Sequence, residues 1–221
     1  MAARETGRPG SERAGAASVG GAGAPRRPRQ ERGQRRVEAI LDAAAAFVAE
    51  EGVPAATMHA IAKRSGTTIG SMYHFFPDRE AVLVALLERH AHALEALAEE
   101  LAAVDWAQLS LEAVVDRYVN ALVGYARAHP DLLPVIHTVQ ALRPDTTRVA
   151  QPEHLLVALT RSIVGARSPG ASAAECAARA AIMLAVVEGV VDRGARAPAP
   201  SPAVLQRELK RVLVGYLKSF E

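Results

Sequence analysis

Residues 57–80 have the sequence TMHAIAKRSGTTIGSMYHFFPDRE, and this stretch decides the fold. Its first part predicts a helix of about two turns, because Thr57 is a good N-cap and Met58, Ile61 and Ala62 form a short apolar face. Gly66 ends that helix, and Thr68 can cap a second short helix that runs through Phe75. Two helices this short, joined by a glycine turn, indicate a helix-turn-helix packed on a neighbouring helix.

The flanking sequence supplies that neighbour and a larger helical domain. Apolar residues recur every three or four positions between about 30 and 51, which is one face of a helix that ends at Gly52. Pro77 and Asp78 then precede a long helix to about residue 103. Further apolar helices are expected at about 108–128, 131–141, 152–167, 172–191 and 202–219. We therefore expect an all-α protein with an N-terminal three-helix helix-turn-helix DNA-binding domain and a larger C-terminal helical domain.

Composition narrows the class of protein. Half of the 221 residues are apolar, which is enough for a sizeable core. The single cysteine, Cys176, excludes an intrachain disulfide and a multi-cysteine zinc site. The sequence has no apolar run long enough for a membrane span and no apolar core of a secretory signal, so we expect a cytoplasmic protein.

Positive charge is concentrated at the N-terminus. Residues 1–36 hold nine arginines and three glutamates, although the net charge of the whole chain is only +2. We expect a disordered basic tail over 1–29, a DNA-binding domain over 30–78 with its motif at about 57–76, and a larger helical domain over 79–221. Two interpretations of the tail stay open, since it either contacts DNA or is only solvated.

The sequence over about 34–82 resembles the TetR family of transcriptional regulators, of the TetR/AcrR type. Matching residues are Ile40, Ala43, Ala44, Phe47, Gly52, Thr57, Ile61, Ala62, Gly66, Gly70, Tyr73, His74, Phe75, Phe76, Arg79, Glu80 and Leu83. The resemblance implies a homodimeric, sequence-specific regulator of double-stranded operator DNA, in which the C-terminal helical domain over 79–221 is the effector-binding and dimerisation domain. Repression, relieved by a small organic ligand, is the family's common mode, although the sequence alone leaves repressor and activator open.

Candidate DNA contacts follow from the motif. A helix that enters the major groove needs little bulk at the backbone, which Gly70 provides, and short hydroxyl side chains can reach phosphates or base edges. The candidates are Arg35, Arg36, Thr57, Lys63, Thr67, Thr68, Ile69, Gly70, Ser71, Tyr73, His74 and Arg79. Arg64 is a further candidate phosphate contact. Thr67 and Ile69 depart from the usual family pattern, so the operator sequence stays open. The alternative interpretation of Tyr73 is a tyrosine packed in the core, and that of His74 is an exposed residue with no DNA contact.

Candidate effector contacts are polar or aromatic residues on otherwise apolar helices. They are His90, Trp106, Tyr118, Tyr125, His137, Gln140 and Met183, each with plain core or surface packing as the alternative. The resemblance also implies a dimer interface made by the helices near 172–191 and 202–219, with Leu209 and Leu213 on the second. Packing inside a single chain would account for the same apolar faces.

Other classes of function are disfavoured. The sequence has no H-E-x-x-H, P-loop, G-x-S-x-G or dinucleotide-binding glycine pattern. His90 and His92 are two residues apart and do not share a helix face. We therefore expect no enzyme, no cofactor and no metal site. A DNA-binding protein with a filled C-terminal core and no effector is the remaining alternative.

Overall fold

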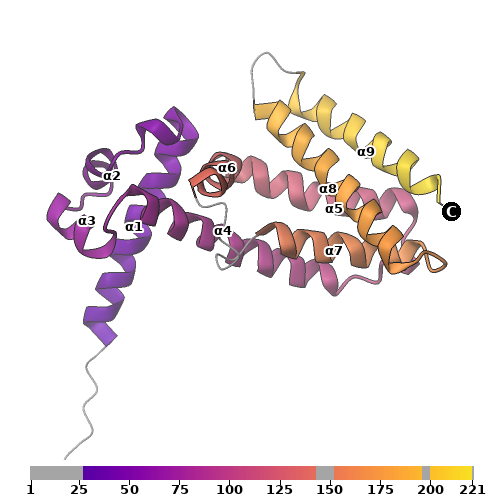
Figure 1. Ribbon diagram of the computed structural model, residues 1–221, viewed down its shortest axis with the longest axis horizontal. Coiled ribbons are helices and arrows are strands. Elements are labelled where there is room, and N and C mark those ends of the chain that lie inside the picture. The colour runs from indigo at the N-terminus through magenta and orange to yellow at the C-terminus, as the bar shows by residue number, and fades with distance from the viewer. Residues whose placement is uncertain (1–26, 143–151, 196–199, 221) are drawn as a thin grey trace, which may run out of the picture.

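The computed structural model describes residues 27–142, 152–195 and 200–220, and every regular element in these ranges is a helix. The expected all-α class is confirmed. Figure 1 shows two units: helices α1–α3, which we call the head, and a larger group of helices, which we call the body. Residues 1–26 of the expected basic tail lie outside the described residues.

The head is built from α1 (Arg27–Glu51), α2 (Met58–Arg64) and α3 (Ile69–Phe75), with a 3-10 turn, η1, at Val53–Ala55. Its core is apolar, with Ile40, Ile61 and Met72 fully buried. Gly66 has a φ of 67°, a backbone conformation that other residues rarely adopt, and this allows the tight turn between α2 and α3. The expected helix-turn-helix packed on a preceding helix is therefore present.

Helix α4 (Arg79–Ala102) links the head to the body. Asp78 caps it, accepting a hydrogen bond of 2.8 Å from the backbone nitrogen of Ala81. Near its start, Leu83 and Leu86 complete the head core, whereas Leu101 near its end belongs to the body core. The head core therefore continues past Asp78, where the sequence suggested the end of the DNA-binding domain.

The body consists of α5 (Leu111–Ala128), α7 (Pro152–Arg167), α8 (Ala173–Ala195) and α9 (Pro202–Lys218), packed around a common apolar core. The expected start of α5 at residue 108 is corrected, because a 3-10 turn, η2 (Trp106–Gln108), precedes the N-cap Ser110. No helix in the described ranges is long and apolar enough to cross a membrane.

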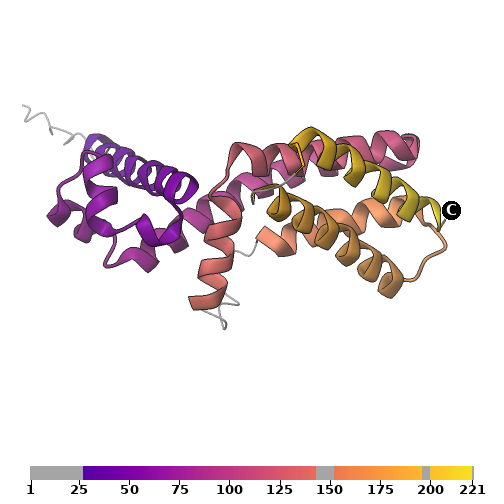
Figure 2. The ribbon, with the colours of Figure 1, turned by 90° about the horizontal axis from the view of Figure 1, so that it is seen from above.

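Helix α6 (Leu132–Leu142) lies between the two units and runs crosswise to the body helices (Figure 2). It packs on α4 and on η1. Val135 and Val139 enter the head core from this side. Together α4 and α6 therefore connect the head to the body.

Candidate nucleic-acid interface and effector pocket

Helices α2 and α3 are each fixed at the N-terminus by a threonine. The Thr57 hydroxyl accepts a hydrogen bond of 3.2 Å from the backbone nitrogen of Ala60, and the Thr68 hydroxyl accepts one of the same length from Ser71. Both threonines are exposed, so capping leaves their oxygens at the surface. The first amides of a helix attract anions, and a phosphate could meet α2 or α3 at these ends.

The outer face of α3 carries the other candidate groups. Tyr73 is 50% exposed, which excludes the alternative of a packed core tyrosine, and His74 and Gly70 are also exposed. Met72 and Phe76 are buried in the head core. The helix is thus amphipathic, with Tyr73 and His74 turned to solvent and its large apolar side chains turned to the head core.

Two candidates turn inward instead. Thr67 is 9% exposed, and Ile69 is half-buried against the head core. Ile69, Met72 and Phe76 are spaced by three and four residues and therefore share the inner face of α3. We correct the expected placement accordingly: the side chain of Thr67 is buried, and that of Ile69 belongs mainly to the packing of the head.

The cations around α3 differ in what they contact. Arg36 donates a hydrogen bond of 3.2 Å to the Ser71 hydroxyl, and Arg35 lies 3.6 Å from Glu31. Arg64 makes two 2.7 Å hydrogen bonds to Glu50, which lower the pKa of that carboxyl below its ordinary value. Lys63 on α2 is exposed, and Arg79 at the start of α4 is half-exposed. Arg64 is thereby held within the head, which makes it a poorer candidate for a phosphate contact than the sequence suggested.

A pocket of ≈ 410 Å³ lies among α4, α5, α6, α7 and α8. Most of its lining is aliphatic, with Leu87 and Leu94 contributed by α4. Three of the seven candidate effector residues line it: Tyr125, His137 and Gln140. A second pocket of ≈ 470 Å³ adjoins the first and shares His137 with it.

The other four candidates line neither pocket. Trp106, Tyr118 and Met183 are buried in the body core, where the Tyr118 hydroxyl is 2.8 Å from that of Thr160. Burial raises the pKa of Tyr118 to about 12. Their sequence pattern, a polar or aromatic residue on an apolar helix, is shared by core residues and pocket residues, so it could not separate the two.

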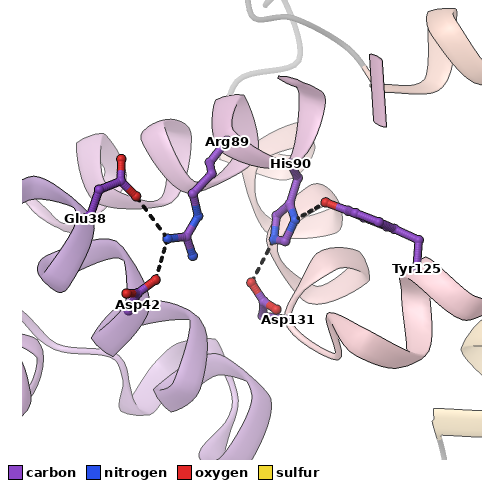
Figure 3. A network of polar contacts seen from close by, with 6 residues as sticks. All are labelled: Glu38, Asp42, Arg89, His90, Tyr125 and Asp131. Carbon is purple, nitrogen blue, oxygen red and sulfur yellow. Dashed lines mark hydrogen bonds and ion pairs between the residues drawn. The ribbon is translucent and has the colours of Figure 1, made fainter. Parts of the chain in front are cut away.

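The fourth of these candidates, His90, is buried beside the first pocket and belongs to a polar network (Figure 3). Its Nε2 lies 2.8 Å from Asp131 Oδ2, and its Nδ1 lies 2.9 Å from the Tyr125 hydroxyl. The preceding residue, Arg89, forms ion pairs with Asp42 at 2.7 Å and with Glu38 at 3.5 Å, both on α1. Sequence reasoning missed Arg89 and Asp131, because neither belongs to a motif. Within the described ranges, no group of three or more His, Cys, Asp or Glu residues could hold a metal ion.

Two family models match this chain. Residues 40–86 match the model described as bacterial regulatory proteins, tetR family, and residues 110–217 match that of the tetracyclin repressor-like C-terminal domain. The first match spans the helix-turn-helix and the start of α4, and the second spans α5 to α9. The two models thus cover both the head and the body.

Individual transcriptional regulators are also similar to this chain. An uncharacterized HTH-type transcriptional regulator of Mycobacterium tuberculosis is 26% identical over 80% of this chain and 92% of its own length. The transcriptional repressor KstR of Mycolicibacterium smegmatis is 32% identical over 31% of this chain and 34% of its own length. Among solved structures, a TetR transcription regulator from Haloarcula marismortui superposes with a TM-score of 0.67, covering 85% of this chain and 98% of that one at 14% identity.

Proposed function

Because this chain belongs to the TetR family of bacterial transcriptional regulators, we propose that it is a homodimeric repressor that leaves its operator when a small organic effector binds in the body. Its role as a DNA-binding transcriptional regulator is that of the family. The observation that carries the proposal is the combination of an exposed polar face on α3 with an apolar pocket against α4. We further propose a cytoplasmic location and no enzymatic activity.

In the proposed complex, α3 enters the major groove of the operator. Gly70 allows close approach of the backbone, and Thr68 and Ser71 lie nearest the base edges. Tyr73 and His74 contact phosphates, with Thr57, Lys63, Arg35, Arg36 and Arg79 as further positioning contacts. The exposure of Tyr73 and His74 supports this assignment. Sequence preference then comes from few residues, because phosphate contacts carry no direct sequence information.

The proposed effector is a largely apolar organic molecule. The pocket of ≈ 410 Å³ is within the usual size of small-molecule sites, and its wall is mainly leucine, isoleucine and valine. The alternative, a DNA-binding protein without an effector, requires a filled body, and the pocket favours the effector-responsive protein over it.

The proposed dimer interface uses the outer faces of α8 and α9. Leu209 and Leu213 are buried in the core of the body, so the single-chain alternative explains these two residues and they do not face a partner. Ile182 on α8 and Val212 on α9 are 51% and 55% exposed, although both are large and aliphatic. Exposed apolar side chains on two neighbouring helices support a second copy of the chain as their cover.

Selection of bound sequences from random double-stranded DNA tests the DNA-binding part directly. We expect a two-fold symmetric site with half-sites about one helical turn apart, roughly 34–36 Å. A screen of apolar metabolites for release of that DNA then tests the effector. Failure to enrich any sequence would contradict the proposal, whereas enrichment without release by any compound would favour the protein without an effector.

A further inference from the structure

Two consecutive residues of α4 bond to different parts of the molecule (Figure 3). Arg89 forms ion pairs with Glu38 and Asp42 on α1, in the head. His90 bonds to Tyr125 on α5 and to Asp131, just before α6. His90 and Asp131 are buried, and Arg89 is partly exposed. One turn of α4 therefore holds the head on one side and the pocket wall on the other.

For a neutral His90 ring, the donors in this network have a defined order. A carboxylate only accepts hydrogen bonds, so His90 donates its Nε2–H to Asp131. In the neutral ring Nδ1 is then an acceptor, and the Tyr125 hydroxyl donates to it. Burial and the charge of Asp131 raise the pKa of Tyr125 to about 12, so the hydroxyl keeps its proton at neutral pH. This hydrogen bond joins α5 to α4, beside the edge-to-face contact of the same two rings.

Tyr125 also belongs to the wall of the pocket. Leu87 and Leu94, which lie one turn before and one turn after His90 on α4, line the same pocket. The ring of His129 packs against Tyr125, with centroids 4.4 Å apart and ring planes tilted by 37°. A molecule in the pocket therefore meets the residue that holds α4.

We propose that Tyr125 senses the occupant of the pocket and that Arg89 and His90 transmit its state to α1 of the head. This inference rests on the proposed function, in which the pocket receives the effector. A ligand with a carbonyl oxygen competes for the Tyr125 proton and breaks the bond to His90, whereas a ligand that only donates leaves the bond in place. The described lining residues include the acidic Glu188 and Asp192 but no lysine or arginine, so the pocket disfavours a ligand with a carboxylate. The proposed ligand is therefore a neutral compound whose carbonyl oxygen accepts the Tyr125 proton.

Hydrogen–deuterium exchange of the free protein tests the transmission without operator or effector. Tyr125→Phe should raise amide exchange in α1 around Glu38 and Asp42 by about three- to tenfold, as expected for the loss of one partly buried hydrogen bond. Tyr118→Phe is the control, because it removes another tyrosine hydroxyl of α5, a fully buried one that bonds to Thr160. It should leave α1 unchanged.

The part played by Arg89 is tested in the same assay. In an Arg89→Met background, Tyr125→Phe should no longer alter exchange in α1, and Arg89→Lys should restore the response. The transmission is overturned by unchanged α1 exchange in Tyr125→Phe, by an equal response in the two tyrosine variants, or by a response that persists without the Arg89 charge. The operator selection is a separate experiment, so these failures leave the proposed function standing.

Two probe compounds test the ligand chemistry. Added to the wild type, 2-undecanone should raise α1 exchange as Tyr125→Phe does, and it should have no further effect in that variant. Undecylamine, which has a similar chain and is a donor in its protonated form, should leave α1 unchanged. No effect of the ketone, or an equal effect of the amine, would contradict the assignment of a carbonyl ligand.

Discussion

At the scale of single residues, Tyr73 tests the placement of α3 on DNA. Its ring is half exposed and its hydroxyl is available to a phosphate. Tyr73→Phe should weaken binding to all sequences alike, by about three- to tenfold, because the lost contact is to the backbone of the DNA. Binding assays on the selected operator and on unrelated DNA measure this, with Tyr216→Phe on α9 as the control. A changed operator preference would show instead that Tyr73 contacts bases.

Tyr118 gives a prediction for pH. Its folded-state pKa of about 12 lies above the ordinary value of 10.0. A raised pKa contributes stability that is complete below pH 10 and is lost as the pH rises toward 12. The free energy of unfolding should therefore fall by about 2–3 kcal/mol over that range from this group alone. Urea unfolding at pH 9 and 11.5 measures the loss, and Tyr118→Phe should reduce it; an unchanged loss would mean that Tyr118 ionises normally.

Some of these residue roles were predictable from sequence and some were not. The sequence predicted Tyr73 as a DNA contact with a packed core tyrosine as the alternative, and the structure exposes its side chain while it buries Met72 and Phe76. Ile69 lies on the same inner face as Met72, three residues before it, although the sequence motif suggested a DNA contact there. Arg89 and Asp131 acquire their roles only from contacts across 47 and 41 residues of sequence, which no local pattern contains.

At the scale of elements, helix positions were predicted well because capping residues, glycines and prolines mark where the helices begin and end. Thr57, Thr68, Asp78 and Ser201 all act as N-caps in the structure. Which face of α8 and α9 packs inside the chain was harder to predict, since both helices are apolar on more than one side. Leu213 and Val212 are adjacent in sequence, yet the first is buried and the second exposed.

The proposed dimer depends on that outer face. Replacing Ile182 and Val212 together with glutamate should give a folded monomer with weaker operator binding, because charge would be buried at the interface without a partner. Analytical ultracentrifugation measures the change, and Leu142→Glu, at another exposed apolar side chain, should remain dimeric. A dimer that persists in the double variant would move the interface elsewhere.

The basic N-terminal tail, here called the arm, leads to a prediction for the salt dependence of operator binding. Deleting residues 1–26 removes four arginines and two glutamates that precede α1. If the arm contacts phosphates, each contact adds a slope of roughly −0.9 to log K against log salt, so the deletion should flatten the slope without changing the preferred operator. Operator titrations over a range of salt concentrations test this. An identical slope in both forms would mean that the arm is only solvated.

At the scale of the whole molecule, the head and the body share α4 and α6. Val135 and Val139 of α6 belong to the head core, and α6 also contributes to the pocket wall. Under the proposed function, a ligand that moves α4 or α6 repositions the head. In a dimer, two heads must stay about one DNA turn apart, roughly 34–36 Å, so a small rotation is enough to weaken binding to both half-sites.

The most direct measurement of the central claim is the affinity of a releasing compound for the protein with and without saturating operator. Effector and operator must oppose each other by the same factor, because binding of each changes the affinity for the other reciprocally. Isothermal calorimetry should show ligand binding weakened several-fold to about a hundredfold by the operator, matching the loss of operator affinity caused by the ligand. Equal ligand affinities in the two conditions would contradict the account and leave a DNA-binding protein whose pocket has no influence on its head.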